Sequence, residues 1–409
     1  MHDADLVIAG GGLVGLTLAC ALRTAGFRLL LVDPATGPAA GHDPRSVALA
    51  PGSRRIFEAL GVWPLVSERT APIRRIQVSE RGGFGRLRLD AGEMDLAALG
   101  HVVMNRDLEA ALRRRLAEAS GSVRIVPGAK VQTPESASDH IRMQLLENET
   151  CRSVSARLLL AADGAASPLR QAAGLSIEDI DYRQTALVAT VRPGRPHKGE
   201  AFERFTPDGP LALLPLPDGR MSLVWTVRSA QADDLAAMDD RDFLHALQQA
   251  FGYRLGRLLE VGDRGAWPLR LRHARRRRHG RMLLVGNAVC SLHPVAGQGL
   301  NLALRDVAGL AEVLHAAARD DVDPADAPGL AAWLTSQQRV QRRVTLFTHG
   351  LVGLFSNDFP GLRLGRNAGL LALAGLPGLR RGFASLGMGR HGGAGRLARG
   401  LPLDVDADG

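Results

Sequence analysis

The stretch that decides the fold is DLVIAGGGLVGLTLACALRTAGFRLLLVD, residues 5–33. Its short apolar run Leu6–Ala9 predicts a buried parallel strand, and the pattern of Leu13–Thr24 predicts a helix. A second apolar run, Arg28–Val32, predicts another buried strand, with Asp33 at its end. The stretch therefore predicts one complete strand–helix–strand unit, the building block of a parallel α/β sheet.

Three glycines lie at fixed spacing between the first strand and the helix: Gly10, Gly12 and Gly15. Gly10 permits the tight turn, Gly12 lets the backbone approach a pyrophosphate, and Gly15 allows close packing of helix on strand. The helix N-terminus presents unpaired N–H groups to the phosphates, and Asp33 is positioned to accept a hydrogen bond from a ribose hydroxyl. The unit predicts dinucleotide binding without separating FAD from NAD; the alternative is a turn that merely needs glycine.

A second copy of this glycine spacing tests how much the motif means alone. It comprises Gly387, Gly389 and Gly392, but no apolar strand precedes it and no helical pattern follows it. We interpret this second copy as part of a flexible tail.

Composition narrows the class of protein. The 409 residues suggest two or three domains of about 150 residues each, and 45% hydrophobic residues fit a globular chain rather than a disordered one. The formal net charge is +9, and Lys130 and Lys198 are the only lysines among 51 basic residues. This excess of arginine indicates an anionic partner: nucleic acid, a nucleotide cofactor or an anionic membrane surface.

Several classes are excluded. The three cysteines have no paired spacing and the twelve histidines form no ligand cluster, so we expect no disulfide framework and no metal. The uncharged stretch Leu6–Leu22 could be taken for a signal peptide or a short membrane span. Acidic rather than basic residues precede it and it contains four glycines, so we favour neither interpretation. We expect a cytoplasmic protein.

Two further apolar strands end in small polar turns. The run Leu158–Ala162 is followed by Asp-Gly at 163–164, and Met282–Val285 is followed by Gly-Asn at 286–287. A helix with apolar residues at helical spacing begins near Leu300. Because α/β sheets bind ligands at the carboxyl ends of their strands, both turns are candidate parts of the nucleotide site.

These motifs together resemble one family. The N-terminal glycines, the Asp-Gly pair and GNAVCSLHPVAGQGLNLALRDV (286–307) resemble the FAD-dependent aromatic hydroxylases, which are class A flavoprotein monooxygenases. Within that family, four stretches resemble the ubiquinone-biosynthesis hydroxylases: the one just quoted, GEAFERFTPDGPLALLPLPDGRMSLVW (199–225), AFGYRLGRL (250–258) and FSNDFPGLRLGRNAGL (355–370). The resemblance runs from residue 5 to about residue 390.

The resemblance implies an α/β, para-hydroxybenzoate hydroxylase-like fold. A Rossmann-type FAD domain would be discontinuous, with an inserted antiparallel-sheet substrate domain and a C-terminal helical region. The implied boundaries are 1–75, 100–178 and 272–340 for the FAD domain, 76–99 and 179–271 for the substrate domain, and 341–409 for the helical region and flexible basic tail.

The middle of the chain independently predicts an antiparallel sheet. Leu211–Leu216 and Met221–Val227 are strand-like runs joined by a Pro-Asp-Gly turn at 217–219, and Ala186–Val191 supplies a third strand. We expect this sheet to cover the flavin; the alternative is a sheet that packs only against its own helices.

The resemblance also implies site residues. The ADP half of FAD would be held by Gly10, Gly12, Gly15 and Asp33. Arg45 and Arg106 match flavin-contacting arginines. Asp163 and Gly164 form the Asp-Gly motif associated with FAD and NADPH. Gly286 and Asn287 would face the ribityl and pyrophosphate groups. The isoalloxazine ring would be framed by Pro294, Gly297, Gly299 and Asn301.

Two positions depart from the family pattern. Asn287 stands where most class A enzymes have Asp, which removes a charge but keeps an acceptor oxygen. Cys290 stands where many relatives have His, so no role is transferred to it, and a small buried filler is the simpler interpretation. His293 lies in the flavin loop, where a histidine satisfied by backbone is the simpler interpretation, so no catalytic acid or base is assigned.

The implied activity is hydroxylation of the ring of a polyprenylated phenol in ubiquinone biosynthesis. FAD would stay bound, NADPH or NADH would visit as reductant, and O₂ would react to give a flavin C4a-hydroperoxide, the oxygen donor. Three alternatives stay open: a sister hydroxylase acting at another ring position, a hydroxylase of soluble phenols, and a non-catalytic flavin-binding subunit of a quinone-biosynthesis assembly.

The C-terminal segment 359–403 contains seven arginines and no acidic residue, together with many leucines. Such a segment fits contact with the inner face of an anionic membrane or with other quinone-biosynthesis proteins, or else an ordinary packed helix followed by a disordered tail. The basic run Arg275–Arg278 is interpreted as a solvated loop. No aromatic residues interleave with these arginines, so nucleic acid is not an expected partner.

Overall fold

The structure is a computed structural model of the chain. It describes residues 2–37, 43–118, 121–291, 297–355, 367, 369, 371–376, 378, 382 and 395–403.

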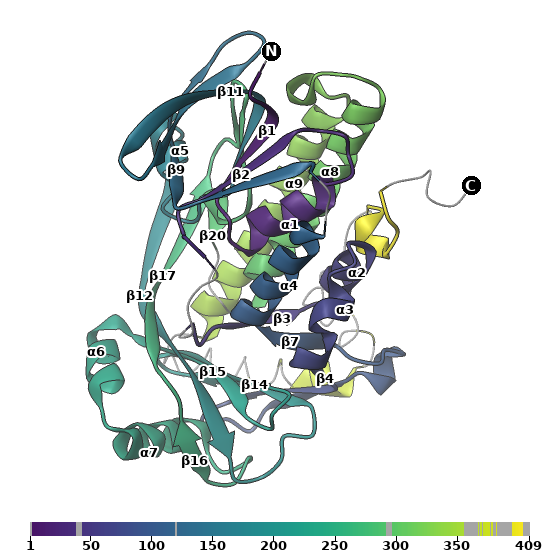
Figure 1. Ribbon diagram of the computed structural model, residues 1–409. Helices are drawn as coiled ribbons and strands as arrows, with labels where there is room; N and C mark the ends of the chain where they lie inside the picture. The colour runs from purple at the N-terminus through teal and green to yellow at the C-terminus, as the bar shows by residue number, and fades with distance from the viewer. Residues whose placement is uncertain are drawn as a thin grey trace.

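The N-terminal strands belong to a sheet of eight strands over the described residues (Figure 1). Its centre is β1 (Ala4–Ala9), which pairs in parallel with β2 (Leu29–Asp33) and β11 (Thr150–Ala161). All but one residue of β1 and all of β2 are buried, as expected for strands covered on both faces. The sheet also contains β8 (Val123–Pro127), β9 (Ala129–Ser136), β10 (Ile141–Glu147), β18 (Arg278–His279) and β19 (Met282–Leu284).

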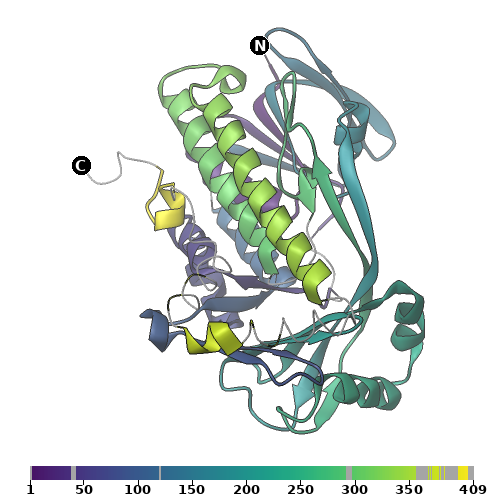
Figure 2. The same cartoon turned by 180° about the vertical axis from the view of Figure 1, so that it is seen from behind.

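The helix α1 (Leu13–Leu22) connects β1 to β2, so the strand–helix–strand unit predicted from residues 5–33 is confirmed. With α4 (Asn105–Ala117) and α8 (Gln298–Arg319), α1 covers one face of the sheet through a common apolar core. The long helix α9 (Leu330–Phe355) runs beside α8 (Figure 2). On the opposite face, side chains of the parallel strands share a second core with side chains of β9, β10 and the short helix α5 (Pro168–Ala172).

A second sheet has nine strands over the described part of the chain, and most of its pairs are antiparallel. Its order is β20–β17–β12–β15–β14–β13–β5–β6, with β16 beside β12. The hairpin predicted at residues 211–227 is confirmed as β14 and β15, and the predicted strand 186–191 lies in β12. The bounds are β5 (Arg75–Glu80), β6 (Arg86–Asp90), β12 (Ile177–Pro193), β13 (Glu200–Thr206), β14 (Gly209–Pro215), β15 (Met221–Arg228), β16 (Leu258–Val261), β17 (Gly265–Ala274) and β20 (Cys290–Ser291).

The two faces of this second sheet have different neighbours. One face packs on α6 (Ser229–Ala237) and α7 (Asp240–Phe251), where Phe202 of the sheet meets Phe251 edge-on. The other face packs on a small sheet of β3 (Ser46–Leu49), β4 (Thr70–Ile73) and β7 (Gly100–Met104). The short helices α2 (Pro51–Ala59) and α3 (Trp63–Val66) flank this small sheet. The small sheet thus joins the two large ones.

The interpretation of Arg275–Arg278 as a solvated loop is wrong at Arg277. Its side chain is 7% exposed and forms an ion pair with Asp306 of α8. A run of four arginines suggested a solvent-exposed loop. The Arg277 side chain is buried instead because the Asp306 carboxylate, which also accepts a hydrogen bond from Gln341, pairs with its guanidinium.

The domain boundaries stay a prediction. The nine-stranded sheet takes strands from both intervals assigned to the substrate domain, and adds β20 from an interval assigned to the FAD domain. Among the described helices, none combines the length and hydropathy needed to cross a bilayer. The glycine copy at 387–392 and most of the segment 359–403 lie outside the described residues.

Candidate functional site

The turn between β1 and α1 has two glycines, Gly10 and Gly15, at positions that no side chain could occupy. Gly10 has a φ of +114°, and a Cβ there would overlap the carbonyl oxygen of Ala162. A Cβ at Gly15 would overlap the carbonyl oxygen of Gly10, so α1 lies directly on the end of the strand. Gly12, which caps the helix without any side-chain hydrogen bond, faces open space. The helix therefore offers unsatisfied N–H groups to a ligand.

The acidic end of β2 is held by residues that the motif does not contain. Asp33 is 5% exposed, and its Oδ2 accepts a hydrogen bond from Arg113 of α4 at 2.6 Å. Its Oδ1 accepts one from the Ala35 N–H, at 3.1 Å. A Cβ at Gly11 would overlap the Asp33 carboxylate. Because a carboxylate has roughly four acceptor positions, Asp33 is fixed in orientation and retains capacity for ribose hydroxyls.

The Asp-Gly motif forms a second turn beside the first. The Asp163 carboxylate accepts hydrogen bonds from the Ser167 hydroxyl at 2.6 Å and the Leu169 N–H at 3.0 Å. Gly164 has a φ of +88°. The Ala162 N–H bonds to the carbonyl of Ala9, which places this turn against the glycine turn. The Asp163 side chain therefore shapes the loop from inside it.

A buried arginine joins this turn to the Gly-Asn turn at 286–288. Arg170 is 3% exposed and donates to the carbonyl oxygens of Ala288 at 2.8 Å and Ala165 at 3.0 Å. In the Gly-Asn turn, Gly286 has a φ of +63° and a Cβ there would lie 2.9 Å from Val14 of α1. Asn287 is exposed. Three turns distant in sequence therefore converge at the start of α1.

The start of α8 resembles the start of α1, because both helices have a glycine at the N-cap and no side-chain cap. Gly297 caps the helix at a φ of +60° without a side-chain hydrogen bond, and Gly299 faces open space. Asn301 is 4% exposed. Its Oδ1 accepts from the Ala50 N–H and the Ser53 hydroxyl, and its Nδ2 donates to the carbonyls of Ala48 and Gly297. Pro294 and His293 lie outside the described residues.

The side chain of Asn301 has no remaining hydrogen-bonding position, because an amide offers two acceptor and two donor positions and protein groups take all four. It therefore acts on the site by holding β3 and α2 against the start of α8. This positioning role differs from direct contact with a ligand.

The two predicted arginines lie near each other, at the junction of the large sheets. Arg45 pairs with Asp43 at 2.7 Å, and its guanidinium lies 5.3 Å from the ring centre of Trp267 on β17. The Asn105 N–H bonds to the Arg45 carbonyl, which brings Arg106 of α4 close by. Arg106 lines a cavity of about 560 Å³, which is also lined by Thr190 of β12 and by Arg220 in the turn before β15.

The residues present fit an anionic dinucleotide. Two helices begin at glycines without side-chain caps, and Gly12 and Gly299 leave room for a ligand at both. Helix N-termini of this kind favour phosphates and other negative groups. Cys290 is 5% exposed, so its interpretation as a small buried filler agrees with the structure. Burial raises the pKa of its thiol to about 11.

Sequence reasoning missed three of these residues. Gly11 belongs to the run of three consecutive glycines, but only the structure explains why glycine is needed there: a Cβ at this position would overlap the Asp33 carboxylate. Arg113 and Arg170 act on partners 80 and 118 residues away, and no local pattern marks such a pairing.

Comparison with known proteins agrees with this geometry. The family described as "FAD binding domain" matches residues 3–345. Ubiquinone hydroxylase UbiL of Rhodospirillum rubrum is 39% identical, covering 98% of this chain and 94% of that protein. 3-Demethoxyubiquinol 3-hydroxylase of Escherichia coli is 34% identical, covering 91% and 95%. The human mitochondrial ubiquinone biosynthesis monooxygenase COQ6 is 29% identical, covering 90% and 89%.

Solved structures confirm the predicted fold. p-Nitrophenol 4-monooxygenase PnpA of Pseudomonas putida superposes with a TM-score of 0.78 at 20% identity, over 93% of this chain and 96% of that one. PqsL of Pseudomonas aeruginosa gives 0.74 at 22% identity, over 90% and 99%. From its motifs, fold and relatives, this chain belongs to the FAD-binding-domain family of flavin-dependent monooxygenases, among the ubiquinone-biosynthesis hydroxylases.

Proposed function

We propose that this enzyme hydroxylates the aromatic ring of a polyprenylated phenol in ubiquinone biosynthesis, with O₂ as oxygen source and NADPH as reductant. The observation that carries the proposal is the 39% identity to a ubiquinone hydroxylase over 98% of the chain. The relatives from Escherichia coli and human mitochondria, both named for ubiquinone biosynthesis or its intermediates, support the same pathway.

Bound FAD would supply the redox chemistry and the activation of oxygen. The chain's own part is to bind, orient and shield. We propose that the pyrophosphate lies at the start of α1 and the ribose on Asp33. The start of α8 would stabilise negative charge on the flavin ring by about 0.3–2 kcal/mol, because a helix N-terminus carries about half a positive charge.

The full set of proposed cofactor residues is unchanged from the sequence prediction. Two roles in it are sharper: Asp163 and Asn301 would act by shaping the backbone around the cofactor, because their side chains already bond to protein groups. The set is Gly10, Gly12, Gly15, Asp33, Arg45, Arg106, Asp163, Gly164, Gly286, Asn287, Pro294, Gly297, Gly299 and Asn301.

The ring position is proposed from the quoted stretches, which look most like 2-octaprenyl-6-methoxyphenol hydroxylase. The substrate would then be a 6-methoxyphenol that carries a prenyl tail. The Escherichia coli relative is named for hydroxylation at position 3 of a demethoxyubiquinol, so a different ring position is the specific alternative.

The decisive experiment is deletion of the gene followed by mass spectrometry of the accumulated quinone precursor. Accumulation of the unhydroxylated 6-methoxyphenol with its tail supports the proposed step. Accumulation of a demethoxyubiquinol would assign the alternative position, and normal ubiquinone would remove the pathway assignment. Phenol-stimulated NADPH oxidation by the purified flavoprotein separates an active hydroxylase from a non-catalytic flavin-binding subunit.

A prenylated substrate resides in the bilayer, so we also propose a cytoplasmic enzyme that contacts the inner membrane face. What supports this is the arginine-rich composition and the leucine- and arginine-rich segment 359–403. Other quinone-biosynthesis proteins are the alternative partner for that segment.

A further inference from the structure

Four arginines gather at the β6 end of the nine-stranded sheet. Ser79 of β5 lies opposite Arg204 of β13 on one side and Arg86 of the edge strand β6 on the other. Arg254, which follows α7, donates from Nη1 to the Ser79 hydroxyl at 2.8 Å. Arg81 begins the turn between β5 and β6. We call Arg81, Arg86, Arg204 and Arg254 the arginine edge.

The arginine edge carries uncompensated positive charge. Burial, and then the charges of Arg254, Arg81 and Arg86, lowers the pKa of the Arg204 guanidinium. Burial and the charge of Arg86 lower the pKa of Arg254. Within the described part of the chain, no carboxylate pairs with any of the four, and the Arg204 Nε is buried without a hydrogen-bond partner. Arginines elsewhere, such as Arg75 and Arg270, each pair with two carboxylates.

Two exposed aromatic side chains are close neighbours of these arginines in the chain. Phe84, in the turn between β5 and β6, is 61% exposed, and Tyr253, next to Arg254, is 68% exposed. Among the exposed large apolar and aromatic side chains of the described residues, Tyr253 ranks first and Phe84 third, after Leu346 at 63%. Aromatic rings beside arginines are typical of surfaces that insert at the headgroup level of a membrane.

The same turn anchors the arginine-rich C-terminal segment. Asn367 is 1% exposed, and its Oδ1 accepts a hydrogen bond from the Gly85 N–H at 2.7 Å. Its Nδ2 donates to Glu80. A Cβ at Gly83 or Gly85 would collide with Asn367, so the turn is shaped to receive it. Further along this segment, Leu371 is 48% exposed.

We propose that the arginine edge, with Phe84 and Tyr253, docks the enzyme on an anionic phospholipid surface. The guanidiniums would bind lipid phosphates, which arginine recognises with paired N–H groups, and the two rings would enter the headgroup layer. The inference deepens the proposed function, because a docked enzyme would receive a prenylated substrate directly from the bilayer. Nucleic acid also binds arginines beside aromatic rings, but a substrate with a prenyl tail favours the lipid.

The test is flotation of the FAD-loaded, full-length protein with vesicles of phosphatidylcholine alone or mixed with phosphatidylglycerol. We expect binding only to the mixed vesicles, weakening as salt rises. The double substitution Arg81→Glu and Arg86→Glu should reduce binding at least about tenfold, since each basic residue near the surface contributes severalfold. The double substitution Phe84→Ser and Tyr253→Ser should also reduce binding, but it should change the salt dependence of binding less than the arginine substitutions do.

The matched control is Arg124→Glu with Arg142→Glu, which makes the same charge change at exposed arginines of the other sheet. This control should retain most of the binding. Equal losses in control and test variants would contradict the proposal, as would unchanged binding of the test variants. Displacement by inorganic phosphate alone would reassign the edge to a small anion, and displacement by single-stranded DNA at equal charge would reassign it to nucleic acid.

The proposed function can fail separately from this inference. Oxidation of NADPH stimulated by a short-tailed phenol in detergent should be the same for wild type and for Arg81→Glu with Arg86→Glu. If the wild-type protein shows no such activity, the hydroxylase proposal is wrong, regardless of the result of the vesicle-binding experiment.

Discussion

At the scale of single residues, the site depends on polar side chains that hydrogen-bond to the protein around them. Asn301 uses all four positions of its amide within the protein, and Asp163 uses both carboxylate oxygens to hold a turn. A side chain of this kind cannot rotate toward a ligand without leaving a buried partner unpaired, which costs about 1–3 kcal/mol. Such residues fix where the backbone N–H groups point.

The first prediction concerns Asn301. Asn301→Ala leaves the Ala50 N–H and two carbonyls without their partner, so the start of α8 should loosen and FAD affinity should fall at least about tenfold. Asn301→Asp keeps the acceptor oxygen but turns a second oxygen toward the Ala48 and Gly297 carbonyls, and should be at least as harmful. Flavin fluorescence titration measures both. Wild-type affinity in Asn301→Ala would contradict the positioning role.

The second prediction concerns Glu203 on β13. Burial raises the pKa of its carboxyl from 4.5 to about 7. The folded state therefore holds a proton that the unfolded state has released, so stability falls as pH rises from about 4.5 to 7 and is level above that. Glu203→Gln mimics the protonated form and should be more stable than wild type at pH 8, by about 1–3 kcal/mol.

Urea unfolding at pH 4.5 and pH 8 checks this prediction. The difference between Glu203→Gln and wild type should nearly vanish at the lower pH. An equal difference at both pH values would mean that the substitution acts through packing and not through the charge of Glu203.

At the scale of elements, three turns that follow β1, β11 and β19 are joined into one site. β11 and β19 are parallel neighbours, so their carboxyl ends meet at the same edge of the sheet. Arg170 then ties the second turn to the third through the Ala288 carbonyl. The sheet brings the turns together, and the buried arginine fixes their spacing.

The third prediction tests this joint. Arg170→Met keeps the length of the side chain and removes both hydrogen bonds. The Ala288 carbonyl then loses its side-chain partner, and the Ala165 carbonyl keeps only a long hydrogen bond from Arg272, at 3.4 Å. Faster release of FAD, by about tenfold, should accompany a stability loss of about 2–3 kcal/mol. Gln171→Ala, on the exposed side of the same helix, is the matched control and should change neither quantity. Release at the wild-type rate from Arg170→Met would show that the turns keep their spacing without it.

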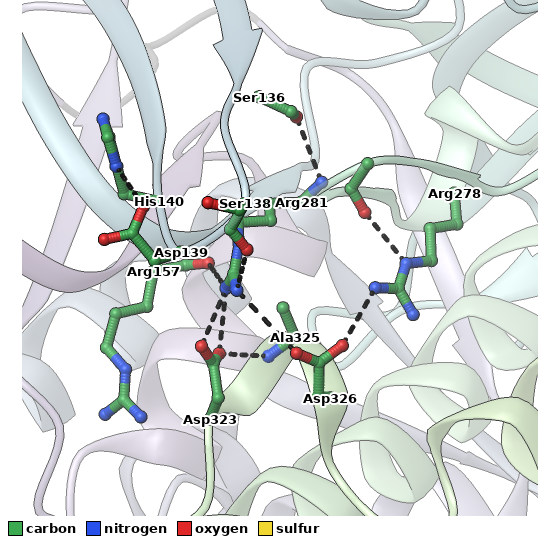
Figure 3. A network of polar contacts seen from close by, with 11 residues as sticks. Ser136, Ser138, Asp139, His140, Arg157, Arg278, Arg281, Asp323, Ala325 and Asp326 are labelled. Atoms are coloured by element: carbon green, nitrogen blue, oxygen red, sulfur yellow. Dashed lines mark hydrogen bonds and ion pairs between the residues drawn. The ribbon is translucent and has the colours of Figure 1, made fainter.

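At the scale of the whole molecule, a second buried arginine joins the end of the first sheet to the helical layer (Figure 3). Arg281 donates to the Ser138 and Arg157 carbonyls and pairs with Asp323 at 2.9 Å, between α8 and α9. Its side chain is 7% exposed. The neighbouring Arg278 pairs with Asp326 at 3.6 Å and is 37% exposed.

The fourth prediction compares these two arginines. Arg281→Met should lower the free energy of unfolding by about 2–4 kcal/mol, because it removes one partner of a mostly buried pair and frees two carbonyls. Arg278→Met removes a half-exposed pair and should cost less than about 1 kcal/mol. Denaturant unfolding measures both. Equal small losses would mean that the network contributes little to holding the layers together.

Local patterns predicted most of the elements that build the site. The alternation of apolar runs and glycine turns predicted β1, α1, β2, β14 and β15 to within a few residues, because backbone geometry and burial act over short stretches. The solvated loop at Arg275–Arg278 failed at Arg277 because its burial depends on Asp306 and Gln341, which are distant in sequence. The local sequence of a basic run does not show whether the fold places an acidic residue beside it.

The sequence by itself determined the strand–helix–strand unit and the glycines at its turn, because a positive φ or a backbone contact at Gly10 and Gly15 admits no other residue. The tertiary structure alone decided that Arg113 pairs with Asp33, that Arg170 links two turns and that Arg81, Arg86, Arg204 and Arg254 share one edge. The physical reason is the distance along the sequence over which each interaction acts. Backbone geometry is set by near neighbours, whereas the partner of a charge is set by which distant strands the fold places side by side.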